Sequence, residues 1–353
     1  MGFNPFNLFL PKRMVGVDIG TSSIKIVEIS KWGGGRTLEN YGEMKSASFF
    51  RDSSSQIGSN LLSAGFISKA MRAILDEARI KTKAAIFSIP DYSTFFVSFD
   101  LPPLTEKEVS EAVRFNAPQY VPLPISETTL DWKIISGTPG NKQPMKVLVA
   151  AVANQIVQEY QRIAQMAGLQ LYALEAEALS IVRALVKDNK MTICLLDIGT
   201  QSTTVNIIEH GVLKKSHSLD FSTGGQMTYS IASALDKSYT EAEDIKIKDG
   251  LLSSNENIKN TLYLQVDPLL TEVKKIISEY SQYEQKEVQE IYLAGGTANL
   301  PGLKEYFAEA LDRKVQIPNC FSDFLTAPIL EETLAEMSPR FCVAVGVALS
   351  GLK

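Results

Sequence analysis

The sequence predicts an α/β protein in which two homologous domains face each other across a cleft. Three observations support this prediction: a short motif occurs once in each half, each copy lies between two strand-like segments, and helical segments alternate with strands throughout. The chain has 353 residues, of which 45% are apolar and 21% charged. These values are ordinary for a globular protein and leave enough chain for two or three domains.

The repeated motif is the strongest of these observations. Val17-Asp18-Ile19-Gly20-Thr21-x-Ser23 recurs as Leu196-Asp197-Ile198-Gly199-Thr200-x-Ser202. The separation of the two aspartates, 197 − 18 = 179 residues, is far longer than the repeat of a solenoid. The repeat therefore indicates two homologous domains rather than a string of small units.

The first half contains alternating strands and helices. Apolar runs predict strands at residues 14–18, 24–30, 36–48, 84–89, 94–100, 130–136, 146–152 and 169–174. The polar residues 51–58 predict a loop, and Pro90-Asp91-Tyr92-Ser93 a turn. Helices are predicted at 66–80 from apolar spacing, from the capping box Thr105-x-x-Glu108 to 115, up to 167 before Gly168, and at 175–185.

The second half begins again with a strand that runs into the motif. Strands are predicted at 192–197, 203–209, 212–220 and 291–294. Helices are predicted at 225–235, 241–246, 257–283, 301–311 and 341–350. The sequence therefore predicts the same strand–turn–strand unit in both halves.

The turn after each aspartate has the chemistry of an anion site. Gly20 and Gly199 allow a sharp bend, which turns the amides and hydroxyls that follow toward one point. Those residues are Thr21, Ser22 and Ser23 in the first copy, and Thr200, Gln201 and Ser202 in the second. Phosphate oxygens fit such a site. The alternative is a plain Asp-x-Gly hairpin that binds nothing.

Charged side chains accompany the two turns. Asp18 and Asp197 end their strands and point into one gap, where two carboxylates suit a hydrated Mg²⁺ beside a triphosphate. Lys25 lies one alternation beyond Ser23 on the same strand face, within reach of the terminal phosphates.

A third glycine-rich element occupies residues 293–303. A buried strand ends in Gly295-Gly296, and a helix is predicted to begin at Pro301. Bare backbone at such a place lets an adenine or a ribose lie flat against it. The alternative is an ordinary corner between a strand and a helix.

Composition excludes several other classes. The net charge of −5 and the pI of about 5.4 argue against a nucleic-acid surface. Cys194, Cys320 and Cys342 share no metal-ligand spacing, and His210 with His217 cannot form a hydrolase site without partners. No stretch reaches the ~18 apolar residues of a membrane span, and residues 1–13 do not form a signal peptide. We therefore expect a cytoplasmic protein.

In this order, the three elements resemble the phosphate-1, phosphate-2 and adenosine motifs of the actin, Hsp70 and sugar-kinase superfamily. The resemblance implies a duplicated actin-like, ribonuclease-H-like fold that holds ATP or ADP with Mg²⁺. It assigns Asp18, Gly20 and Lys25 to the first motif, Asp197 and Gly199 to the second, and Gly295, Gly296 and Thr297, with Asn299 beside them, to the third.

Two further segments receive roles from this resemblance. Gly224-Gly225 and Glu241-Ala242-Glu243-x-x-Lys246 resemble the segment that holds the ribose and adenine, although Thr240-x-x-Glu243 also fits a plain capping box. Glu175 occupies the place of a glutamate that polarises the attacking water in Glu-Pro-x-Ala. Here an alanine replaces that proline, and a carboxylate at a helix N-terminus is the alternative.

Within the superfamily, nearly the whole chain resembles the PilM family of type IV pilus systems. The similar stretches are residues 15–28, Glu111-Ala112-Val113-Arg114-Phe115-x-Ala117-x-Gln119-Tyr120-Val121-Pro122-Leu123-Pro124, and Asp131-Trp132. The second belongs to an inserted subdomain shared with FtsA. FtsA is the weaker match, because its linker and amphipathic membrane helix have no counterpart after the final predicted helix.

The resemblance implies a domain plan: residues 1–48 and 148–187 form the first actin-like domain, 49–147 the inserted subdomain, and 188–353 the second domain, with a helical nucleotide-binding subdomain at 221–288. It also implies a cytoplasmic ATP-binding scaffold, held at the inner membrane face through partners, that docks the N-terminal peptide of a PilN-like protein and has at most weak ATPase activity.

Three alternatives stay open beside this reading. They are an FtsA-like polymerising division protein, an actin-fold ATPase and a kinase. The apolar segment 6–11 is either a tail that packs on its own domain or a mimic of the PilN peptide, which would give self-association.

Overall fold

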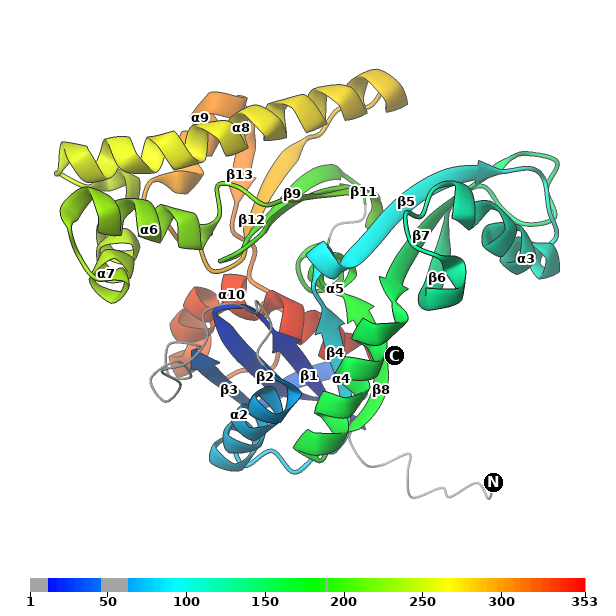
Figure 1. Cartoon of the computed structure of the whole chain (residues 1–353), viewed down its shortest axis with the longest axis horizontal. Coiled ribbons are helices and arrows are strands. Elements are labelled where there is room, and N and C mark those ends of the chain that lie inside the picture. The colour runs from blue at the N-terminus through cyan, green and yellow to red at the C-terminus, as the bar shows by residue number, and fades with distance from the viewer. Residues whose placement is uncertain (1–11, 46–62, 188–189, 353) are drawn as a thin grey trace.

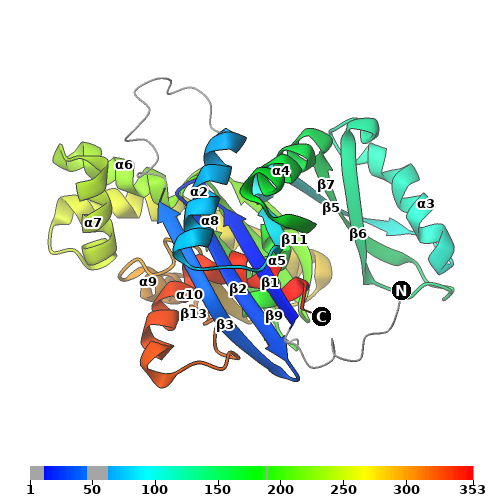
Figure 2. The ribbon, with the colours of Figure 1, turned by 90° about the horizontal axis from the view of Figure 1, so that it is seen from below.

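The computed structural model describes residues 12–45, 63–187 and 190–352. Two five-stranded sheets make up most of it (Figures 1 and 2). In the order in which they lie, the strands of the first sheet are β3 (Gly35–Lys45), β2 (Ser23–Trp32), β1 (Lys12–Ile19), β4 (Ala84–Ile89) and β8 (Gln170–Ala176). Those of the second are β11 (Val212–Leu219), β10 (Thr203–Glu209), β9 (Thr192–Ile198), β12 (Glu290–Ala294) and β13 (Lys314–Gln316).

The two sheets are built on the same plan. An antiparallel hairpin surrounds each copy of the motif, so that Asp18 pairs with Lys25 and Asp197 pairs with Thr204. Strands β4 and β12 then run parallel to β1 and β9. The duplication predicted from the motif is confirmed and extends over the whole of each sheet.

Helices cover both faces of each sheet, which explains why the strands are almost continuously apolar. Val15 and Val17 face one layer of helices, whereas Met14 on the same strand faces the other. The outer layer on the first sheet is α2 (Ala64–Glu77) and α4 (Asn154–Ala167), and the layer between the sheets is α5 (Glu177–Leu185) and α10 (Glu331–Ser350). The far face of the second sheet is covered by α6 (Gly224–Leu235), α7 (Tyr239–Asp249), α8 (Glu256–Glu284) and α9 (Leu303–Leu311).

The C-terminal helix α10 returns to the first domain. An added Cβ at Gly16 of β1 would lie 2.0 Å from the carbonyl oxygen of Ala344, and one at Gly346 would lie 2.0 Å from that of Ser180. The helix is thus held against both β1 and α5. It also begins ten residues before the predicted start at 341, with Pro339 inside it. Helix α10, which lies in the range 188–353, thus packs on the first sheet as well as on the second.

The inserted subdomain is a three-stranded sheet with one helix. Its strands lie in the order β5 (Thr94–Leu101), β7 (Met145–Ala153) and β6 (Thr128–Ser136), and α3 (Glu106–Asn116) covers one face. Phe99 and Val147 pack there against Val109 and Val113 of α3. The range 49–147 also contains β4, which is a strand of the first sheet, and α2, which packs on that sheet.

Several other boundaries differ from the predictions by a few residues. Strand β8 continues to Ala176, so α5 begins at Glu177 and not at 175. Helix α9 begins at Leu303, after a turn, and not at 301. In the described parts of the chain, the short 3-10 turns are Asp91–Ser93, Ala117–Gln119, Ile125–Glu127, Gly250–Leu252 and Pro328–Leu330.

Three expectations concern residues that lie wholly or partly outside those that the structure describes. The segment 6–11 and the loop 51–58 lie outside the described residues, as do the last three positions of the strand predicted at 36–48. Among the helices that the structure describes, none is both long and apolar enough to span a bilayer.

Candidate functional site

The two motif turns line one cleft between the sheets. The amide of Gly20 donates to the carbonyl of Ser23 (3.1 Å), and the amide of Gly199 donates to that of Ser202 (2.9 Å), so both turns close in the same way. The predicted residues that line the cleft are Asp18, Gly20, Thr21, Ser22, Ser23, Lys25, Asp197, Gly199, Thr200, Gln201, Ser202, Gly295 and Gly296. The structure therefore brings together elements from the start, the middle and the end of the chain.

Four carboxylates, Asp18, Asp197, Glu177 and Asp91, form one cluster in and behind this cleft. Asp18 accepts hydrogen bonds from Ser88 (3.1 Å) and from Lys25 (3.5 Å). Asp197, opposite, belongs to the second turn, and Glu177 at the start of α5 also lines the cleft. Among the described residues, only Lys25 forms an ion pair with one of these carboxylates, that of Asp18. The excess of negative charge favours a bound cation.

Asp91 is the fourth carboxylate, and it is held to Glu177. The amide of Asp91 donates to Oε2 of Glu177 (3.2 Å), and Oδ1 of Asp91 accepts from the amide of Ala178 (3.1 Å). Its Oδ2 atom is buried without a hydrogen-bond donor among the described residues. Asp91 follows the buried strand β4, much as Asp18 and Asp197 lie at the ends of their strands, and this position after a strand is the sequence signal that marks it.

Burial sets the protonation of this cluster. It raises the pKa of Asp197 to about 7, with a further contribution from the charge of Asp18 that Lys25 opposes. Burial likewise raises the pKa of Asp91 to about 7, against the hydrogen bond from Ala178. The pKa of Glu177 is raised well above its usual range, first by burial and then by Asp18 and Asp91. A cation in the cleft would displace protons from this cluster.

The Gly295-Gly296 pair forms the third wall. Gly295 has a φ of +87°, and a Cβ there would lie 2.4 Å from Oδ1 of Asp197. Its amide donates to the carbonyl of Pro339 in α10 (2.9 Å). Gly296 faces open space, with no atom within 4 Å of an added Cβ. Bare backbone is therefore required at the first position and exposed at the second.

Gly224 and Gly225 lie behind the second turn and not on the cleft surface. Their amides donate to the carbonyls of Gly199 (2.8 Å) and Thr200 (3.0 Å). A Cβ on Gly224 would lie 2.3 Å from Oγ1 of Thr297. Because these glycines have no side chains, the N-terminus of α6 can pack directly on the second motif turn. Thr297 joins the same contact, since its amide donates to the carbonyl of Ile198 (3.2 Å).

Glu243 and Lys246 form a separate network on α7. Lys246 is buried and its Nζ donates to the carbonyl of Gly224 (2.9 Å), to Thr228 (2.8 Å) and to Glu243 (2.7 Å). Glu243 also accepts from Thr228. The capping box of α7 is Ser238 with Glu241, and not Thr240 with Glu243. Glu243 is therefore free of that structural role and holds Lys246 beside the start of α6.

Two further predicted site residues, Asn299 and Glu175, also do not line the cleft. Asn299 donates to the carbonyl of Glu336 (3.2 Å) at an exposed position. Glu175 is bound by both terminal nitrogens of Arg183 and accepts from Ser180 (3.0 Å). Since this fork fixes Glu175 between α5 and the end of β8, the carboxylate that faces the cleft from this segment is Glu177. The sequence motif predicts Glu175 for this role, but because β8 continues to Ala176, Glu177 is the residue that lines the cleft.

A cross-element contact closes one edge of the cleft. Arg340 of α10 donates to Glu43 of β3 (2.9 Å), and Glu43 also accepts from Ser23 (2.9 Å). Arg340 and Glu43 both line the cleft, and neither had a sequence signal. The arrangement can bind a polyanion through two amide-rich turns, with a cation held among the carboxylates. No group of three or more metal-ligating side chains occurs in the described parts of the chain, so such a cation would depend on water and the anion for its remaining ligands.

Known proteins resemble this chain over most of its length. A family model described as type IV pilus assembly protein PilM matches residues 16–352. The cell division protein FtsA of Enterococcus faecalis is 23% identical over 351 residues, which cover 86% of this chain and 78% of FtsA. FtsA of Enterococcus hirae is 25% identical over 349 residues, with the same coverage of both chains.

Solved structures share the fold. A PilM–PilN type IV pilus biogenesis complex matches with a TM-score of 0.83 and 23% identity, over 96% of this chain and 98% of the other. The ethanolamine utilization protein EutJ of Carboxydothermus hydrogenoformans matches with a TM-score of 0.55 and 19% identity, over 96% and 90%. MreB5 of Spiroplasma citri bound to ADP matches with a TM-score of 0.51 and 13% identity, over 92% and 98%. The predicted actin-like α/β fold is thereby confirmed.

Proposed function

Because the chain belongs to the PilM family of type IV pilus assembly proteins, we propose that it is a nucleotide-gated adaptor of the pilus machinery. It binds ATP or ADP with Mg²⁺ between its two domains, in the cytoplasm, and docks the N-terminal peptide of a PilN-like membrane protein. The observation that carries the nucleotide part is the pair of duplicated turns that face each other across a cleft rich in carboxylates.

The residues present fit a magnesium nucleotide. The amides and hydroxyls of the two turns would hold the phosphates, and Lys25 would offset their charge. Asp18 and Asp197 would hold the hydrated cation, which supplies positive charge against the phosphates when bound. Any hydrolysis is weak, and we assign an orienting role toward water to Glu177, because Arg183 holds Glu175 elsewhere.

Calorimetric titration tests this proposal. The protein is titrated first with MgATP and then with the N-terminal peptide of its PilN-like partner. We expect both to bind, with the peptide affinity dependent on the nucleotide present. Nucleotide binding without peptide binding would instead favour the polymerising role suggested by the FtsA relatives, which sedimentation with MgATP would then examine.

The affinity for MgATP should rise with pH. Asp197 has a pKa of about 7 in the nucleotide-free protein, against an ordinary 3.8, so it is protonated below that pH and must ionise to hold a cation. Its burial makes the nucleotide-free fold less stable as pH rises from about 4 to about 7, and a bound cation removes that cost. One such group gives about tenfold tighter binding at pH 8 than at pH 6, with proton release near pH 6.5.

Calorimetry in two buffers of different ionisation enthalpy measures the released protons. The variant Glu241→Gln is the control, because this exposed carboxylate lies outside the cleft and the hydroxyl and amide of Ser238 lower its pKa. Equal affinities at pH 6 and pH 8, with no proton release, would show that Asp197 is not a cation ligand.

The inserted subdomain is the proposed docking site for the peptide. The similar solved structure with a TM-score of 0.83 is a PilM–PilN complex. In this chain, the inserted subdomain exposes large apolar side chains on and after α3. Phe115 is 79% exposed, and Tyr120 and Leu123 are exposed beside it in sequence. Tyr120 also stacks on Phe99 of β5, which places its ring next to the small sheet.

Replacing Phe115 with glutamate should weaken peptide binding about 30-fold. An exposed aromatic side chain at the centre of an interface typically contributes about 2 kcal/mol, and a buried carboxylate adds a desolvation cost. Tyr283→Glu on α8 is a matched control, because Tyr283 is also 79% exposed but lies in the second domain. If both variants bound the peptide like the wild type, docking at α3 would be refuted while nucleotide binding stood.

A further inference from the structure

Two β-bulges face each other where the inserted subdomain meets the second domain. In β6, the pairing with β7 shifts between Ile134 and Ser136, so Ile135 has no partner in the ladder. In β11, Ile207 pairs with Lys215 and Ile208 with Leu213, so Lys214 is the additional residue. A bulge frees its residue from the ladder and redirects its side chain and carbonyl.

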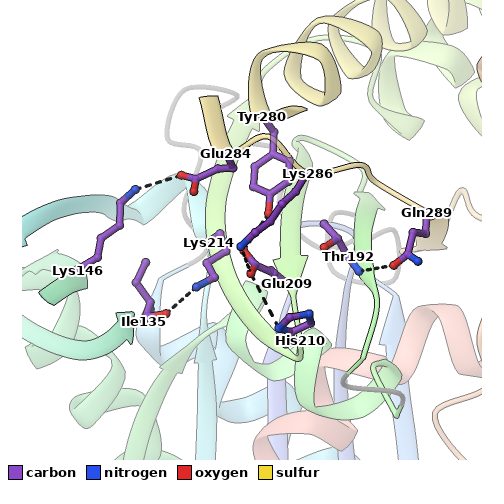
Figure 3. A network of polar contacts seen from close by, with 10 residues as sticks. All are labelled: Ile135, Lys146, Thr192, Glu209, His210, Lys214, Tyr280, Glu284, Lys286 and Gln289. Atoms are coloured by element: carbon purple, nitrogen blue, oxygen red, sulfur yellow. Dashed lines mark hydrogen bonds and ion pairs between the residues drawn. The ribbon is translucent and has the colours of Figure 1, made fainter. Parts of the chain in front are cut away.

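The two bulge residues bind each other. Nζ of Lys214 donates to the carbonyl oxygen of Ile135 at 2.6 Å, a pair that we call the bulge contact (Figure 3). Ile135 is only 8% exposed, and Lys214 is half-buried. Burial lowers the pKa of Lys214, while the charge of Glu209 opposes that shift. A charged donor to a buried carbonyl is among the stronger protein hydrogen bonds.

Apolar and ionic contacts surround the bulge contact. Ile135 and Leu148 of the small sheet share one apolar cluster with Ile208 and Leu213 of the second sheet. This face of the small sheet is opposite to the one that packs on α3. Nearby, Lys146 of β7 pairs with Glu284, the last residue of α8, at 3.2 Å (Figure 3).

On the second-domain side, the joint is braced from behind. Glu209, at the end of β10, accepts hydrogen bonds from Tyr280 of α8 (3.0 Å) and from Lys286. It is 7% exposed. The end of the β10–β11 hairpin is thereby tied to the end of α8, so both contacts to the inserted subdomain come from one braced unit.

Strand β10 connects this joint to the second motif turn, which lines the proposed nucleotide site. Its first residue, Thr203, follows Ser202 of the turn directly, and its last residue is Glu209. A strand of this length spans about 20 Å and behaves as a stiff rod within a sheet. By contrast, the chain joins the inserted subdomain to the first domain, through the short links β4–β5 and β7–α4.

We propose that the bulge contact makes the inserted subdomain follow the second domain, so that nucleotide-driven closure of the cleft moves it relative to the first sheet. This inference rests on the proposed function and adds its regulation. The subdomain is covalently attached to one domain and held by contacts to the other. A rotation between the domains therefore must either break these contacts or shift the subdomain that carries the proposed docking surface.

Spin labels measure this movement. Arg72→Cys on α2 and Arg114→Cys on α3 place one label on the first domain and one on the inserted subdomain, both at exposed positions. The native cysteines, Cys194, Cys320 and Cys342, are buried. We expect MgATP to shift the distance between the labels in the wild type. Lys214→Met should lose this shift, and Lys214→Arg, which keeps a cationic donor, should retain it.

Lys215→Met is the matched control. It removes the same charge from the same strand, but Lys215 contacts the ring of Tyr283 within the second domain, at 5.5 Å from its centre. This variant should shift like the wild type. If Lys214→Met also shifted like the wild type, the proposal would be overturned.

A nucleotide-free readout separates this proposal from the proposed function. In Lys214→Met, but not in Lys215→Met, the amide hydrogens of residues 134–136 should exchange roughly tenfold faster. The lost hydrogen bond from a charged donor raises the equilibrium constant for local opening by about one order of magnitude. If calorimetry found no MgATP binding, the proposed function would fail while hydrogen exchange still decided whether the contact holds. Unchanged exchange would overturn the bulge contact as the joint.

Discussion

The variant Asp197→Ala is expected to bind MgATP at least ~100-fold more weakly than the wild type. Asp197 lies opposite Asp18 in the cleft, and Gly295 has no side chain that would displace its carboxylate. Losing it removes a charge and the hydrogen bonds to a hydrated cation, each worth about 1.5–3 kcal/mol. Two such losses correspond to a factor of ~100 or more.

The same substitution should not weaken the binding of Mg²⁺-free ATP. A carboxylate near phosphate oxygens repels them, so its removal leaves that affinity equal or higher. It should not destabilise the nucleotide-free protein either, because burial and the charge of Asp18 already disfavour the ionised form of Asp197. Calorimetry with and without Mg²⁺, together with thermal unfolding, separates these effects.

Asp220→Ala controls for the loss of one acidic residue in the second domain, because Asp220 is exposed and does not line the cleft. It should bind MgATP as the wild type does. An equal loss of affinity with and without Mg²⁺ in Asp197→Ala would mean that the aspartate supports the turn instead of a cation.

The variant Gly346→Ala should lower the free energy of unfolding by about 3 kcal/mol. Its Cβ would lie 2.0 Å from the carbonyl oxygen of Ser180 and 2.5 Å from the carbonyl carbon, both backbone atoms of α5 that cannot rotate away. Helix α10 would have to move off α5, which disturbs the apolar layer between the two sheets. Arg183, which donates to the carbonyl of Gly346 (3.0 Å), would lose this contact as well.

Urea unfolding followed by circular dichroism measures the effect. The control is Gly65→Ala in α2, where an added Cβ meets only the end of Met166, at 3.8 Å. That variant should gain roughly 0.5–1 kcal/mol, since alanine is the better helix former. If Gly346→Ala were as stable as the wild type, the close approach of α10 to α5 would not exist in solution.

Local sequence determined much of the fold and part of the site. The two Asp-Ile-Gly-Thr turns, their hairpins and their shared cleft were predictable, because glycine, strand alternation and a polar run act within about fifteen residues. The repeat itself required two domains of one plan. Most elements were likewise predictable within a few residues, with errors at ends such as 341 and 175, where long-range contacts extend a helix or a strand.

The tertiary structure alone decided which carboxylates meet. Strands β4 and β8 pair in parallel, with Ile89 opposite Ala176, and this register brings Asp91 beside Glu177 although 86 positions separate the two residues in the chain. Sequence spacing carries no information on such a pairing. For the same reason Glu175, which the motif favoured, turns to Arg183.

What the sequence by itself determined about this protein is the duplicated nucleotide-type turn, since every feature of it is encoded in consecutive residues. What only the tertiary structure decided is the set of long-range contacts around these turns. They are the buried Asp91–Glu177 pair, the packing of α10 on the first sheet, and the two bulges that join Lys214 to Ile135. These depend on contacts between segments that are distant in the chain, where packing and burial, and not local propensity, select the arrangement.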